Sequence, residues 1–61
     1  MPSIAAELAS ERLGRPVTDW ITEQRDGGAS WSLIVARLHA ETRLAVSDVT
    51  LRHWIDAERA A

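Results

Sequence analysis

Apolar residues recur at helical spacing in the middle of the chain, between residues 31 and 42. They fall at positions i, i+3, i+4 and i+7, which places them on one face of a helix. These residues are Trp31, Ile34, Val35 and Leu38. Ser30 precedes the segment and is a favourable N-cap. The pattern predicts a helix that begins after Ser30 and ends near Thr42 or Arg43.

A second clear amphipathic helix is predicted to begin at Ser47, which is again a favourable N-cap. Val46 precedes the cap and Leu51 occupies the fourth helical position, so this pair has the spacing of a hydrophobic staple. Leu51, Trp54 and Ile55 share one face of the helix. That face is expected to be buried.

The N-terminal part of the chain has two weaker helical patterns. Residues 3–13 carry a narrow apolar stripe of Ile4 and Leu8, with neighbouring alanines, after a candidate N-cap at Ser3. A further helix is predicted from Pro16, because proline is favoured at the first helical position. Its apolar side is formed by Val17, Trp20, Ile21 and Gln24. Gly27 is predicted to supply its left-handed C-terminal residue.

Composition is consistent with one small all-α domain. The chain has 61 residues, of which 46% are hydrophobic and 26% are charged. A chain of this size has a thin core and no room for a catalytic cleft between two layers, so no enzymatic activity is expected. Cysteine is absent, and His39 and His53 lie on different predicted helices, so we expect no metal and no cofactor.

The sequence contains no candidate signal peptide and no apolar run of the roughly 18 residues that a membrane span needs. We therefore expect a cytoplasmic location, no membrane contact and no small-molecule ligand.

The charge balance is mildly acidic, with seven basic and nine acidic residues and a net charge of −2. This balance disfavours non-specific binding to nucleic acid, which depends on neutralised phosphates. The chain contains no lysine, so all seven of these basic residues are arginines. A GC-rich coding sequence explains that bias, and so does the suitability of guanidinium groups for phosphate and guanine. Any nucleic-acid surface must therefore be a local basic patch.

Two stretches resemble a known family. They are residues 29–40, ASWSLIVARLHA, and residues 44–55, LAVSDVTLRHWI. They are similar to the helix-turn-helix of small DNA-binding proteins in actinobacteria and their phages, and to the homeodomain-like domain of recombinases and transposases. The resemblance covers about residues 13–55. It implies a homeodomain-like three-helix unit containing a helix-turn-helix in residues 14–61, with an extra N-terminal helix in residues 1–13.

The turn between the two motif helices departs from the family pattern. The family usually has a left-handed glycine there, whereas this chain has Arg43. Either Arg43 adopts the left-handed conformation, at a cost on the order of 1 kcal/mol, or the preceding helix continues and the turn is longer.

The resemblance implies that the last helix enters the major groove of DNA. The residues expected to contact bases are Ser47, Val49, Thr50, Arg52 and His53. Val49 contacts a thymine methyl group or packs into the core. Thr50 contacts a base edge or is simply solvated. Arg52 contacts a phosphate or guanine, or it forms a surface ion-pair ladder with Asp48 and Asp56.

The first motif helix is expected to contact phosphates. Its candidate residues are Ser30, Ser32, Arg37 and Arg43. The alternative for the two arginines is that they are solvated charges. The tryptophans Trp20, Trp31 and Trp54 are interpreted as core residues, because each belongs to an apolar stripe.

The expected function is sequence-specific binding of double-stranded DNA, as a phage, prophage or bacterial transcriptional regulator or a recombination accessory factor. Binding as a homodimer or as paired copies is expected, with the Ile4 and Leu8 stripe as the candidate contact. The alternative is a protein-interaction module that uses the same scaffold without binding DNA. The acidic balance and the aspartates beside Arg52 favour this alternative.

Overall fold

The computed structural model describes residues 4–60, which form four helices and no strand. These helices are α1 (Ile4–Leu13), α2 (Val17–Asp26), α3 (Trp31–Thr42) and α4 (Asp48–Ala60). The all-α prediction is confirmed for this part of the chain, and the last two helices begin at the residues that the caps predicted. Ser3, the predicted cap of the first helix, lies outside the described residues.

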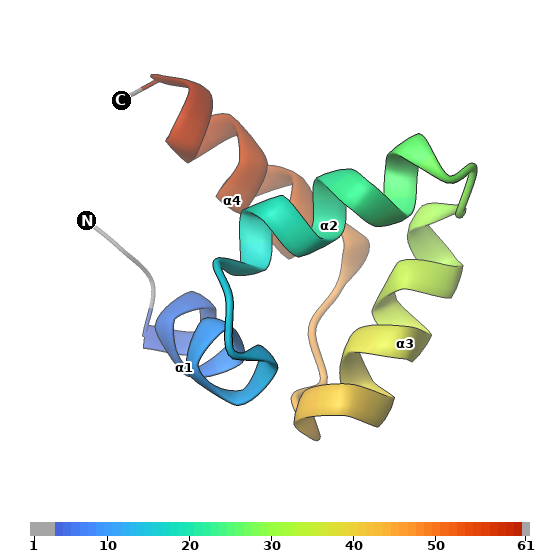
Figure 1. Cartoon of the computed structure of the whole chain (residues 1–61). Helices are drawn as coiled ribbons and strands as arrows, with labels where there is room; N and C mark the ends of the chain where they lie inside the picture. Colours follow the sequence, from blue (N-terminus) through green and yellow to red (C-terminus); the bar gives the residue numbers. More distant parts are fainter. Residues whose placement is uncertain (1–3, 61) are drawn as a thin grey trace.

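All four helices contribute to or pack against one core (Figure 1). The buried hydrophobic residues are Ala9, Val17, Ile21, Ala29, Ile34, Leu38, Leu51 and Trp54. Helices α2, α3 and α4 pack against one another, and α1 packs against α2 and α3. The buried faces predicted for the last two helices are confirmed. Trp20, Trp31, Val35, Val46 and Ile55 are partly buried at the edge of the core.

The buried side of α1 differs from the predicted stripe. Ala9 is completely buried, while Ala5, Ala6 and Leu13 pack against the core. Ile4 is 83% exposed. Small side chains allow the backbone of α1 to approach its neighbours closely, and Ile4 lies about 140° around the helix from Ala9. Ile4 therefore does not share the buried face.

Helix α2 begins at Val17, one residue later than the sequence pattern predicted. Pro16 is its N-cap, with φ −56° and ψ 128°, and makes no side-chain cap. Ser10 of α1 provides the missing acceptor, because its Oγ accepts a hydrogen bond from the Val17 amide at 2.8 Å. The same hydroxyl donates to the Ala6 carbonyl at 3.0 Å. The start of α2 is thus stabilised by a side chain from the preceding helix.

The prediction that Gly27 is the left-handed residue after α2 was wrong. Gly27 has φ −79°, whereas Gly28 has φ +90°. The Gly28 amide donates to the Arg25 carbonyl at 2.9 Å, and the Ala29 amide donates to the Gln24 carbonyl at 3.0 Å. This is the Schellman pattern with Gly28 at the left-handed position. The helix runs one residue further than expected, so the second glycine takes the left-handed conformation.

Helix α3 ends at Thr42, and Arg43 adopts the left-handed conformation with φ 63° and ψ 19°. The Arg43 amide donates to the His39 carbonyl at 2.8 Å. This result decides between the two alternatives for the turn, because α3 does not continue through Arg43. Residues 43–47 then connect α3 to α4.

Thr42 stabilises the connection from inside the fold, where it is 1% exposed. Its hydroxyl donates to the Leu38 carbonyl at 2.7 Å and accepts from the Leu44 amide at 3.3 Å. The guanidinium of Arg12 on α1 donates to the Thr42 carbonyl. These contacts satisfy backbone groups at the end of α3, so the direction in which the chain enters α4 depends partly on α1.

Replacing Arg43 with glycine is expected to stabilise the domain by about 0.5–1 kcal/mol, because glycine adopts a positive φ without the steric cost that arginine incurs. Thermal unfolding followed by circular dichroism measures the change. Ala36→Gly is the matched control, since Ala36 is exposed within α3 and glycine there should destabilise by about 1 kcal/mol. Equal destabilisation by both variants would contradict the effect assigned to the positive φ.

Candidate nucleic-acid interface

One side of α4, which we call its free side, is exposed to solvent at Val49 and His53. Leu51 is completely buried and Trp54 is 9% exposed, so these residues mark the side that faces the core. With about 100° per residue, Val49 and His53 lie on the opposite side. Val49 is 53% exposed and His53 is also exposed. Of the two alternatives for Val49, the structure supports the surface position.

The hydroxyl groups in the first turn of α4 contact each other. Ser47 Oγ accepts a hydrogen bond from the Thr50 amide at 3.2 Å, as the predicted N-cap requires. Ser47 Oγ and Thr50 Oγ1 are also 3.0 Å apart and share a hydrogen bond. Ser47 is exposed and Thr50 is half-buried. The pair restrains both side chains at the edge of the free side of α4.

Arg52 lies on the flank of α4 and forms only part of the expected ion-pair ladder. Its Nη2 is 3.7 Å from Asp48 Oδ2, and both side chains are about half exposed, so the pair contributes little to stability. No ion pair with Asp56 is present in the described part of the chain. Instead, the Arg52 guanidinium lies 5.2 Å from the centre of the Trp31 ring, which is a cation–π distance.

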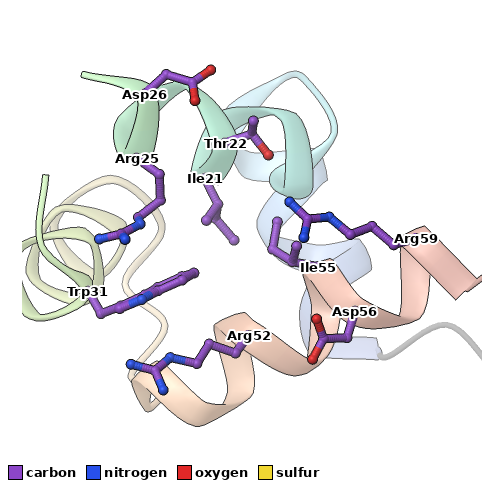
Figure 2. A pocket seen from close by; sticks show the side chains of 9 residues that line it. All are labelled: Ile21, Thr22, Arg25, Asp26, Trp31, Arg52, Ile55, Asp56 and Arg59. Atoms are coloured by element: carbon purple, nitrogen blue, oxygen red, sulfur yellow. The ribbon is translucent and has the colours of Figure 1, made fainter. Parts of the chain in front are cut away.

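Trp31 has a contact that the sequence pattern did not indicate. The Arg25 guanidinium is 4.8 Å from the ring centre, and Figure 2 shows Arg25 and Arg52 on opposite sides of the indole. Trp31 is half-buried and packs against the core, as predicted. It also joins the end of α2, the start of α3 and the flank of α4.

The candidate phosphate contacts on α3 are divided between two regions. Ser30 accepts from the Leu33 amide at 3.2 Å and is exposed, as is Ser32. Both residues adjoin Trp31 in the sequence, and the ring of Trp31 contacts Arg52. Arg37 is about 120° around the helix from Trp31, and its Nη1 donates to Gln24 Oε1 on α2 at 2.5 Å. Arg43 lies at the far end of α3.

Arg25 and Arg59 were not among the residues predicted from sequence, yet they line the same groove as Arg52. The groove has a volume of about 330 Å³ and lies between α2 and α4, beside Trp31. Ile21 and Ile55 form apolar parts of its surface, and Asp26 and Asp56 also line it. Both newly found arginines lie in the last turns of their helices. In that position a basic residue is usually explained by the helix dipole, so the sequence carried no separate signal.

Two of the arginines outside the groove have partners elsewhere in the fold. Arg15 forms an ion pair with Glu23, and Arg12 donates to the Thr42 carbonyl. Three of the seven arginines in the chain line the groove. This is a local basic surface in an acidic protein.

No cluster of three or more potential metal ligands occurs among residues 4–60. None of the helices in that range has the length and apolar character needed to cross a membrane.

No family model matches this chain, no curated protein matches it, and no solved structure matches it. The structure of residues 4–60 defines a small all-α domain, with an exposed face on α4 and an adjacent groove lined by arginines.

Proposed function

We propose that this protein is a homeodomain-like helix-turn-helix module that binds double-stranded DNA. In this proposal α3 and α4 are the motif, α2 completes the three-helix unit and α1 is the additional helix. The observation that carries the proposal is the free side of α4, where Val49 and His53 project opposite the buried Leu51. The left-handed residue between α3 and α4 also supports it, because such a turn redirects the chain sharply.

Base contacts are assigned to the N-terminal half of α4. Val49 is suited to a thymine methyl group, and His53 and Thr50 to hydrogen-bonding base edges. Ser47 is the N-cap, so its hydroxyl is already engaged, and it acts by orienting Thr50. Arg52 contacts guanine or a neighbouring phosphate.

Phosphate contacts are assigned to the start of α3 and to its exposed arginines. The first-turn amides after Ser30 carry the positive end of the helix dipole, and Ser32 adds an exposed hydroxyl. Arg37 and Arg43 provide positive charge at other points of the helix. These contacts position the protein on DNA without distinguishing sequences.

A single module of this size covers only about 600–1,000 Å² on DNA, so paired copies are part of the proposal. The exposed Ile4 and the half-buried Leu8 on α1 remain the candidate contact between copies. The biological role that we propose is that of a phage, prophage or bacterial transcriptional regulator or a recombination accessory factor.

The test is binding of the full chain to a random-sequence duplex library, measured at several salt concentrations from about 50 mM upward. The proposal expects enrichment of a common sequence and affinity that falls as salt increases. Failure to bind duplex DNA at about 50 mM salt, where phosphate contacts are least screened, would reject it. A protein-interaction role through the face of Val49 and His53 would then be the remaining candidate.

A further inference from the structure

We propose that Arg25 and Arg59 bind the DNA backbone together with Arg52, so that the groove beside Trp31 is a phosphate-binding surface. We call this surface, formed by Arg25, Arg52 and Arg59 around Trp31, the arginine groove. The inference rests on the proposed function and adds contacts from α2 and from the C-terminal half of α4.

The three arginines come from two helices and line the same groove; in Figure 2 Arg25 and Arg52 extend to opposite sides of Trp31, and Arg59 lies across the groove near Ile55. Arg52 and Arg59 are seven residues apart on α4, which corresponds to nearly the same side of the helix and to about 10 Å along its axis. Arg25 reaches the groove from the last turn of α2. An extended anionic chain matches this spread of charge better than a single small anion.

Most N–H groups of these arginines have no protein acceptor. Arg25 donates through Nη1 to the Ala29 carbonyl at 3.0 Å. The Asp48 oxygen nearest to Arg52 is 3.7 Å away, which is longer than a hydrogen bond. Arg59 has no hydrogen bond or ion pair within residues 4–60. Since each guanidinium carries five N–H donors, many remain available to phosphate oxygens.

Trp31 holds two of these groups in place. With Arg25 on one side of the indole and Arg52 on the other, both ring faces are covered, so Trp31 is not free to stack on a base. Stacked guanidinium groups keep their N–H edges free for hydrogen bonds. Restraining them before binding lowers the conformational entropy that is lost when phosphate binds.

The groove lies beside the side of α4 to which the base contacts are assigned. Arg52 lies about 100° from Leu51 around α4, between the buried side and the free side that carries Val49 and His53. A helix in the major groove has a phosphate backbone on each flank, so residues at this angle meet phosphates.

Asp26 and Asp56 reduce but do not cancel the positive charge of the lining. Three arginines face two aspartates, and Figure 2 shows Asp26 pointing in the opposite direction from Arg25. Asp48, outside the lining, also lies 3.7 Å from Arg52, so the choice of a polyanion rests on the N–H groups that have no protein acceptor and on their spread along the groove.

The experiment compares Arg25→Gln and Arg59→Gln with Arg15→Gln in the full chain, using the duplex selected from the library and unrelated duplexes. Arg15 is the matched control, because its replacement changes the net charge equally but removes an arginine that pairs with Glu23 outside the groove. Thermal unfolding of each variant verifies that the fold is retained. We expect each groove variant to bind all duplexes about three- to tenfold more weakly at low salt, with a salt slope smaller by about 0.9. Arg15→Gln should behave as the unmodified protein does.

Several outcomes would overturn the inference while leaving DNA binding intact. In one such outcome, Arg25→Gln and Arg59→Gln both bind duplex DNA with the affinity and the salt slope of the unmodified protein. Another is an equal loss in Arg15→Gln, which would mean that only net charge matters. If the unmodified protein binds no duplex, the inference and the proposed function fail together. Binding of polyglutamate that is lost in Arg25→Gln, without binding of DNA, would assign the groove to an acidic protein instead.

Discussion

Trp54→Ala is expected to leave the domain largely unfolded at 25 °C. Trp54 is 9% exposed and belongs to the core in which α4 meets the other helices. Large-to-small changes of a buried aromatic residue cost about 3–5 kcal/mol. The whole stability of a small domain is of similar size, so loss of this one side chain removes most of it.

Circular dichroism at 222 nm during heating and during urea titration measures this effect. His53→Ala is the control, because His53 is exposed next to Trp54 in the same helix and should change stability by less than about 0.5 kcal/mol. A Trp54→Ala protein that melts at the temperature of the unmodified chain would show that α4 does not use this face in the core.

The second large effect concerns DNA recognition. His53→Ala should weaken binding to the selected sequence by about 1–3 kcal/mol and relax the preference at one or two base pairs. Arg52→Ala should do the same where Arg52 contacts guanine, and should weaken binding to every duplex alike where it contacts phosphate, as proposed for the arginine groove. Arg37→Ala and Arg43→Ala should instead weaken binding to every duplex alike and reduce the salt dependence. Base edges carry sequence information and phosphates do not, which separates the two kinds of variant.

Repeating the library selection with each variant tests this division. Glu7→Gln on α1 is a suitable control, since it alters charge on an exposed residue remote in sequence from the motif. Unchanged base preference in His53→Ala would remove this residue from the proposed base contacts. If Arg37→Ala weakens binding to one sequence only, Arg37 does not belong to the residues that contact phosphates.

Arg37 is a candidate phosphate contact from the sequence, and the structure shows that its side chain already has a partner. The sequence marks it only as a basic residue on the polar side of a helix. In the structure its guanidinium is hydrogen-bonded to Gln24 on α2, away from the contact between Trp31 and Arg52. Binding of phosphate by Arg37 therefore requires this hydrogen bond to be shared or replaced.

The sequence by itself determined the helices and much of the core. Ser30 and Ser47 cap the helices that they were predicted to begin, and Ile34 and Leu51 lie on the predicted buried faces. Such features depend on residues within about four positions of one another, through helical periodicity and local hydrogen bonds. Periodicity in a short alanine-rich segment is weaker evidence, which is why the exposed position of Ile4 was not predicted.

Only the tertiary structure decided which side chains of different helices meet. Ser10 of α1 caps α2 through the Val17 amide, and Arg12 binds the carbonyl of Thr42 at the end of α3. The choice of Gly28 over Gly27 as the left-handed residue followed from where α2 ends. The arginine groove brings together residues 25, 52 and 59 around Trp31. No local pattern encodes these contacts, because they depend on the angles at which the helices pack, and those angles are set by the shared core.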